Sequence, residues 1–193
     1  MLKRLYEWTM RLAARPDAVW WLAAISFVES SFFPIPPDVL LVPMVLAARD
    51  RAWFIATVCT VSSVLGGYVG YAIGYFGFEA LGRPILEFYG ALDKYASVKA
   101  TFDEWGAWFI IVKGATPIPY KLVTIFAGTV QFDILQFTFS SLISRALRFF
   151  LLAGLLWWFG PPIRDFIERR LTLVTTVFVV ALIGGFVALR YLF

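Results

Sequence analysis

The segment Glu29-Ser-Ser-Phe-Phe-Pro34-Ile35-Pro36-Pro37-Asp38 interrupts residues 18–48, an apolar stretch in which Glu29 and Asp38 are the only charged residues. Proline lacks a backbone donor and clashes with the preceding turn, so no continuous α-helix passes through this segment. Broken backbone at membrane depth needs cover from protein or from a water-filled cavity. We therefore expect residues 18–48 to form a helix–break–helix hairpin that enters a membrane and returns to the same side. The alternative is an ordinary spanning helix followed by a proline-rich surface loop.

A second stretch, residues 105–132, has the same design with the opposite charge. Its centre reads Lys113-Gly-Ala-Thr-Pro117-Ile118-Pro119-Tyr120-Lys121, and no other residue of the stretch is charged. When the two Pro-Ile-Pro triplets are aligned, Asp38 falls on Lys121, and Glu29 falls one residue from Lys113. This predicts a second re-entrant hairpin. The prolines expected to shape the two hairpins are Pro34, Pro36, Pro117 and Pro119.

Composition supports a membrane location for these hairpins. The chain has 193 residues, of which 61% are hydrophobic and 16% are charged, and its mean hydropathy is +0.79. Average soluble domains are about 45–50% apolar and about 25% charged, so a soluble enzyme and a disordered chain are both excluded. The absence of histidine and the single cysteine exclude His-based triads, histidine or zinc sites and an internal disulfide, so neither metal nor cofactor is expected.

The rest of the chain divides around the hairpins. Residues 52–78 contain no charge and are long enough to cross a bilayer, which takes about 20 apolar residues. The other expected parts are an amphipathic interfacial helix at 1–17, a polar extramembrane linker at 79–104, a spanning helix at 134–159, and a cytoplasmic loop with a carboxy-terminal spanning helix at 161–193.

The order of hairpin, spanning helix and serine pair occurs twice, which indicates an internal duplication. Ser62 and Ser63 of the first half match Ser140 and Ser141 of the second. With a cytoplasmic amino terminus, the cytoplasmic side carries more Lys and Arg than the far side, as the positive-inside rule requires. The predicted fold is an all-α membrane domain, residues 18–160, built as an inverted repeat of hairpin plus spanning helix. Such repeats are typical of transporters, whose sites lie near the membrane midplane.

Six ionisable residues lie inside the apolar stretches. Each costs roughly 2.5–3.5 kcal/mol at a membrane-helix centre, so unpaired they would cost about 15–20 kcal/mol together, more than a typical folding free energy of about 5–15 kcal/mol. They must therefore pair, cluster or face water, and oppositely charged hairpins that face each other would let acid meet base. Two acids against four bases leave a positive surplus, which suits an anionic head group. The candidate phosphate-binding residues are Lys113, Lys121, Arg145 and Arg148.

The two acids have candidate roles of their own. Desolvation favours the protonated form of a carboxyl group, whereas a nearby lysine opposes it. Glu29 and Asp38 are therefore candidates for gating or for coupling transport to protons. The purely structural interpretation is that the charges form buried salt bridges that join the two repeats, although buried ion pairs are weak evidence for stability.

The two hairpin signatures resemble those of the DedA family, also described by the VTT or SNARE-associated Golgi protein domain. The resemblance covers residues 18–160 and implies facing re-entrant hairpins and the transport or scrambling of lipids. It implies that Glu29 and Asp38 match the family's essential acids. Lys113 and Lys121 stand where well-known members have arginine, and Pro37 replaces a glycine that often precedes the acid.

The sequence thus predicts a multi-pass protein of the bacterial inner membrane, not an enzyme, that moves an anionic lipid such as undecaprenyl phosphate or a phospholipid across the bilayer. Protons are a candidate coupling ion, no nucleic-acid partner is expected, and the oligomeric state is open, a homodimer included. The alternatives are an ion-coupled transporter of a small solute, a non-catalytic scaffold for membrane homeostasis, and a lipid phosphatase, against which the absence of histidine argues.

Overall fold

The computed structural model describes residues 15, 17–32, 36–88, 90, 92–115 and 119–169. The expected carboxy-terminal spanning helix, most of the expected amino-terminal helix, Pro34 and Pro117 lie outside these residues. The described part contains helices and no strand. The helices are α2 (Ala18–Ser31), α3 (Asp38–Ala47), the 3₁₀ turn η1 (Arg49–Arg51), α4 (Ala52–Gly77), the π-helical turn η2 (Phe78–Gly82), α5 (Arg83–Phe88), α6 (Leu92–Trp105), α7 (Ala107–Ala115), α8 (Tyr120–Thr129) and α9 (Ile134–Arg169).

Both proline segments break the helix as the sequence predicts. α2 and α3 have 14 and 10 residues, and α7 and α8 have 9 and 10, so each is shorter than the about 20 residues of a spanning helix. A proline directly precedes the second helix of each hairpin, Pro37 before α3 and Pro119 before α8. The carbonyl of Pro36 accepts from the Val39 amide at 3.4 Å, and that of Pro119 accepts from the Leu122 amide at 3.0 Å. Because an amide nitrogen in the first turn has no partner within the helix, proline is tolerated there.

Two helical segments, Arg49–Ala80 and Ile134–Gly160, are long and apolar enough to cross a membrane. α4 matches the expected helix at 52–78, whereas α9 continues ten residues beyond the expected end at residue 159, to Arg169. Pro161 has no N–H to donate to the carbonyl of Trp157, one turn earlier. The guanidinium of Arg49 donates to that carbonyl instead, through Nη2. The contact gives this carbonyl a partner, and α9 continues through Pro161 and Pro162 to Arg169.

Replacing Arg49 with Ala is therefore expected to lower the free energy of unfolding by about 0.5–1.5 kcal/mol, the net contribution of an ordinary hydrogen bond, because the Trp157 carbonyl loses its donor. The matched control is Arg51→Ala, since Arg51 is exposed and lies only over the ring of Phe54, at 5.4 Å; a surface change of this kind stays within about 0.5 kcal/mol. Denaturant unfolding in detergent micelles measures both. Equal effects would show that Arg49 does not stabilise the end of α9.

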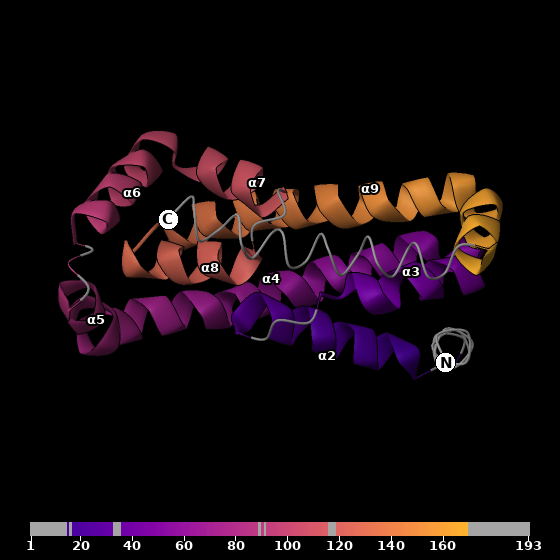
Figure 1. Ribbon diagram of the computed structural model, residues 1–193, viewed down its shortest axis with the longest axis horizontal. Coiled ribbons are helices and arrows are strands. Elements are labelled where there is room, and N and C mark those ends of the chain that lie inside the picture. The colour runs from indigo at the N-terminus through magenta and orange to yellow at the C-terminus, as the bar shows by residue number, and fades with distance from the viewer. Residues whose placement is uncertain are drawn as a thin grey trace.

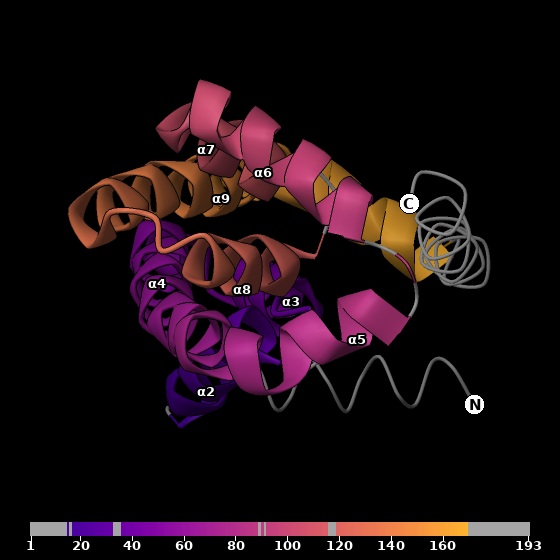
Figure 2. The same cartoon turned by 90° about the vertical axis from the view of Figure 1, so that its left-hand side faces the viewer.

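Each hairpin packs its first helix against the long helix that follows it and its second helix against the other long helix. α2 packs against α4 and α7 against α9, the long helix that follows each hairpin, whereas α3 packs against α9 and α8 against α4. Figure 1 shows that α2 and α3 run in opposite directions, as do α7 and α8, along the bundle formed with α4 and α9. Seen end-on, α2 and α7 lie on opposite outer sides of α4 and α9 (Figure 2). The re-entrant path and the inverted symmetry stay predictions, because both are defined relative to a membrane.

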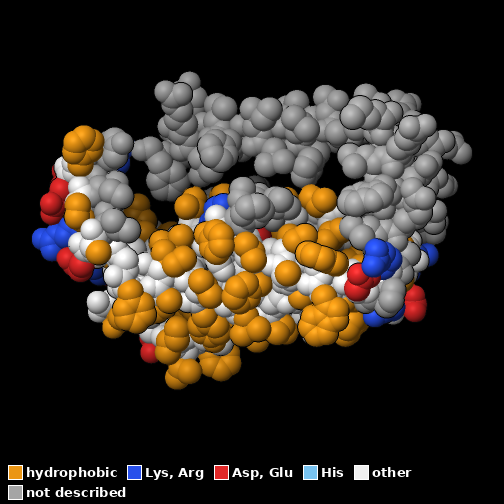
Figure 3. All heavy atoms as spheres, turned by 90° about the horizontal axis from the view of Figure 1, so that it is seen from below, with side chains coloured by type: hydrophobic (Ala, Val, Ile, Leu, Met, Phe, Trp, Pro, Cys, Tyr) orange, Lys and Arg blue, Asp and Glu red, His pale blue; other side chains and the backbone are white. Residues whose placement is uncertain are grey.

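The surface is apolar along the bundle and charged at its ends. In Figure 3, hydrophobic side chains cover the middle of the face shown, whereas Lys, Arg, Asp and Glu gather at its two ends. Trp20, Phe76 and Trp158 are among the large apolar side chains left exposed. The linker helices α5 and α6 carry exposed i,i+4 ion pairs, such as Lys99–Asp103 at 2.9 Å. This distribution is what a bundle surrounded by hydrocarbon requires.

Small residues allow the helices of this bundle to approach closely. A Cβ added at Gly66 would lie 2.0 Å from the carbonyl oxygen of Phe27 on α2, and one added at Gly74 would lie 1.9 Å from that of Ile125 on α8. A Cβ at Gly128 would likewise meet the Tyr71 carbonyl oxygen at 2.0 Å. Gly66 and Gly74, eight residues apart on α4, and Gly128 on α8 therefore serve helix packing.

Candidate functional site

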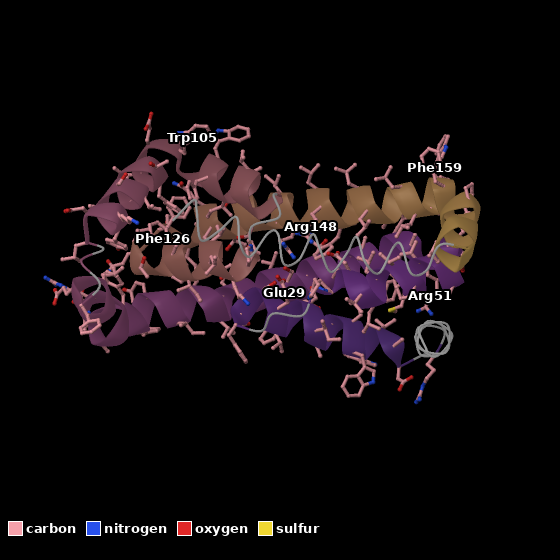
Figure 4. All side chains as sticks on the ribbon, in the orientation of Figure 1. Glu29, Arg51, Trp105, Phe126, Arg148 and Phe159 are labelled. Atoms are coloured by element: carbon pink, nitrogen blue, oxygen red, sulfur yellow. The ribbon has the colours of Figure 1, made fainter. Side chains whose placement is uncertain are left out.

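Two carboxylate–arginine pairs lie inside the bundle, each joining the first hairpin to α9. Arg145 Nη2 lies 3.5 Å from Glu29 Oε2, and the two side chains are 2% and 14% exposed. Arg148 Nη2 donates to Asp38 Oδ2 at 2.7 Å, and these side chains are 29% and 22% exposed. The spacing of three residues places both arginines on one face of α9. In Figure 4, Glu29 and Arg148 lie near the middle of the long axis, between Trp105 toward one end and Phe159 with Arg51 toward the other.

Arg145 is held by polar and aromatic groups from other helices. Its Nε donates to the Ser63 hydroxyl at 2.7 Å, which bonds the Ser30 hydroxyl at 2.6 Å. Its guanidinium carbon lies 4.6 Å from the ring centres of both Tyr120 and Phe149. Stacking between aromatic rings favours a desolvated cation, and arginine suits it because its charge is planar and delocalised. The sequence therefore positions a guanidinium, rather than a mobile surface charge, in the core.

The second pair leaves hydrogen-bonding capacity unused. Asp38 begins α3, where the helix dipole favours a carboxylate. Its Oδ1 is buried and has no hydrogen-bond partner among the described residues. Of the five N–H donors of a guanidinium, that of Arg148 uses one toward a described residue, on Asp38. The Asp38–Arg148 pair is thus both more exposed and less saturated than the Glu29–Arg145 pair.

Lys121 of the second hairpin is not brought to an acid in the way we expected. Lys121 is half-buried on α8, and no described carboxylate lies within ion-pair distance of it. Lys113 lies near the end of α7, and its side chain is outside the described part of the chain. Both acids pair with arginines of α9 instead. For Asp38 the reason is that α3 packs directly against α9, which brings Asp38 within reach of Arg148.

The sequence reasoning gave no role to several polar residues that complete this region. Ser30 and Ser63 connect Glu29 to Arg145 through hydroxyl groups, since Ser30 Oγ also lies 3.2 Å from Glu29 Oε2. In the sequence, Ser63 is recognisable only as part of the serine pair that marks the repeat. Tyr120 and Ser141 are buried, and their hydroxyls have no hydrogen-bond partner among the described residues. The repeated serine pair could have identified Ser141 as a candidate site residue, whereas no pattern in the sequence identifies Tyr120.

Comparison with known proteins gives relatives over most of the chain. An uncharacterized protein of Haemophilus influenzae is 35% identical over 184 residues, 95% of each chain. An uncharacterized protein of Histophilus somni is 35% identical over 156 residues, 81% of each chain. The inner membrane protein YqaA of Escherichia coli is 24% identical over 143 residues, 71% of this chain and 93% of YqaA. No family model matches the chain, and no solved structure matches it.

Proposed function

The chain belongs to the same family as the uncharacterized Haemophilus influenzae protein, and from this premise we propose that it is a multi-pass inner membrane protein of DedA type that moves an anionic lipid across the bilayer. The relative YqaA is an inner membrane protein, which supports the inner membrane location, as do the two helices long enough to span. The packing of each hairpin against both long helices supports an inverted repeat.

The observation that carries this proposal is the pair of carboxylate–arginine contacts in the middle of an apolar bundle. Desolvating two charges costs more than their attraction returns unless the geometry is excellent, so stability alone does not account for such pairs. Ionisable groups at membrane depth mark substrate or ion pathways by default. A site in which cations meet exchangeable carboxylates suits an anionic substrate, because the substrate can take the place of a carboxylate.

Arg148 is the cation that an arriving head group meets first. It is the more exposed arginine of the two pairs, and most of its donors are unused by described residues. A phosphate group accepts two parallel N–H bonds from a planar guanidinium, which a single carboxylate oxygen does not match. The head group would compete with Asp38 for Arg148, and Lys121 would add a cation from the opposite hairpin.

In this proposal the chain performs no bond-breaking chemistry, and the carboxylates act as gates. Release of Asp38 from Arg148 would leave its carboxylate without its counter-ion. Protons therefore stay a candidate coupling ion for Asp38 and Glu29. A coupled mechanism predicts that translocation by the wild type depends on pH.

The test is a translocation assay with purified protein in liposomes, comparing a fluorescently labelled lipid phosphate with a labelled lipid whose head group is uncharged. The wild type should move the phosphate lipid between leaflets, and Asp38→Asn and Arg145→Ala should each abolish that movement. Glu79→Gln is the control, because Glu79 is 73% exposed, in an ion pair of the linker. Lipids that stay in their leaflet while a small solute moves would refute the proposal, as would unchanged rates in both variants.

A further inference from the structure

Two hydroxyl groups in the core are left with unused hydrogen-bonding capacity among the described residues. Tyr120 is 1% exposed and Ser141 is 0% exposed. The two hydroxyls lie within hydrogen-bonding reach of each other, but neither has a partner of good geometry among the described residues, and even if one donates to the other, one O–H donor is left over. A buried polar group without a partner is destabilising, and such groups are rare in native structures unless they bind something or do chemistry.

An unfilled space adjoins the Tyr120 hydroxyl. A Cβ added at Gly67 would lie 3.4 Å from Tyr120 Oη and from Thr124 Cγ2, and 3.5 Å from Phe137 Cζ, which is ordinary contact. At Gly66 and Gly74, by contrast, the added atom would collide with backbone at 2.0 and 1.9 Å. Packing therefore requires glycine at those two positions but not at Gly67, where a methyl-sized space is left beside an unpartnered donor.

A third donor group borders the same place. The Arg145 guanidinium stacks on the Tyr120 ring at 4.6 Å, and Ser141 lies one helical turn before Arg145 on α9. The 3.5 Å between Arg145 and Glu29 exceeds the about 2.7–2.9 Å of a charge-assisted hydrogen bond. Two hydroxyls and an incompletely bonded guanidinium therefore converge beside a space that holds one small atom.

We propose that Tyr120, Ser141 and the space over Gly67 form a hydroxyl site that binds one oxygen of an anionic phosphate head group, with Arg145 beside it. The inference rests on the proposed function and adds residues to its site. The phosphate oxygen accepts from the Tyr120 and Ser141 hydroxyls, and its charge competes with Glu29 for Arg145. Since Arg148 is the exposed cation and Arg145 the buried one, the head group reaches the hydroxyl site after Arg148.

The experiment uses Gly67→Ala, Ser141→Ala and Tyr120→Phe in the full chain. Each should lower translocation of the phosphate lipid at least about tenfold, a factor that corresponds to one lost interaction of ordinary strength. Each should also lose the rise in melting temperature that dodecyl phosphate, but not dodecanol, gives to the wild type in detergent. Without the ligand, all three should melt at or above the wild-type temperature, because each fills a space or removes an unpartnered hydroxyl.

Two neighbours provide matched controls. Ser140 is as buried as Ser141, but its hydroxyl bonds carbonyls of its own helix, at 2.6 Å to Gln136 and 3.2 Å to Phe137. A Cβ at Gly77 meets no atom within 4 Å. Ser140→Ala and Gly77→Ala should therefore retain translocation and the response to dodecyl phosphate.

The outcomes separate the hydroxyl site from the proposed function. Normal translocation and ligand response in Gly67→Ala and Ser141→Ala would overturn the hydroxyl site while leaving lipid transport standing. A fall in ligand-free melting temperature in all three variants, with the ligand response kept, would also overturn it, because an ordered internal water would then occupy the space. A wild type that binds dodecyl phosphate through these residues but moves no lipid would support the site and refute transport.

Discussion

Replacing Glu29 with Gln is expected to lower the free energy of unfolding by about 3–5 kcal/mol, the usual effect of removing one partner of a buried ion pair. The Arg145 side chain is 2% exposed, so its guanidinium would keep its charge without a counter-ion and without water. Ser63 would still accept from Arg145 Nε, but a neutral hydroxyl compensates only part of the desolvation of a cation. Denaturant unfolding in detergent micelles, followed by tryptophan fluorescence, measures the change.

The same substitution at Glu79 is the control. Glu79 Oε2 lies 3.4 Å from Arg83 Nη1, nearly the Glu29–Arg145 distance, but the two side chains are 73% and 57% exposed. Water and ions screen a pair of this kind, so Glu79→Gln should leave the unfolding midpoint unchanged. Glu29→Gln and Glu79→Gln with the same midpoint would mean that Glu29 is not the buried counter-ion of Arg145.

Replacing Gly74 with Ala is expected to lower the free energy of unfolding by about 3 kcal/mol, the upper end of the usual range for overpacking. The new Cβ would lie 1.9 Å from the Ile125 carbonyl oxygen and 2.8 Å from the Ile125 carbonyl carbon. Both atoms belong to the backbone of α8, so no side-chain rotation relieves the clash. The helices must separate, and the close contact of Gly128 with Tyr71 on the same pair is lost with it.

Gly77→Ala is the matched control, one helical turn later on α4. Nothing lies within 4 Å of the Cβ position at Gly77, and alanine is a better helix former than glycine by about 1 kcal/mol. The control should therefore melt at or above the wild-type temperature, while Gly74→Ala melts well below it. If Gly74→Ala melts with the control, α4 and α8 do not pack as closely as described.

The prolines and the apolar runs allowed much of this architecture to be predicted. Closely spaced prolines predict a break near Pro36 and near Pro119, and both breaks are found. The charge-free run at 52–78 became α4 almost residue for residue. These features are local, so one sequence is sufficient to predict them. The end of α9 is different, because the donor that the Trp157 carbonyl receives in place of Pro161 comes from Arg49, 108 residues away in sequence.

The pairing of charges could not be predicted from the sequence, because it depends on which helices pack together. The argument from insertion cost indicated that the acids need partners, but it did not distinguish Lys121 from Arg148 as the partner of Asp38. Packing of α3 on α9 decides between them. The unpartnered hydroxyls of Tyr120 and Ser141 are likewise a property of the packed core, since either residue in isolation is unremarkable.

The central claim is that the first hairpin and α9 meet through opposite charges inside the bundle, and a double-mutant cycle on Asp38 and Arg148 tests it most directly. The cycle compares the unfolding free energies of Asp38→Asn, Arg148→Gln and the double variant with that of the wild type. The 2.7 Å contact predicts a coupling energy of about 1–3 kcal/mol, with the double variant less destabilised than the sum of the single ones. Effects that add within about 0.5 kcal/mol would show that the two residues do not interact, and would contradict the account.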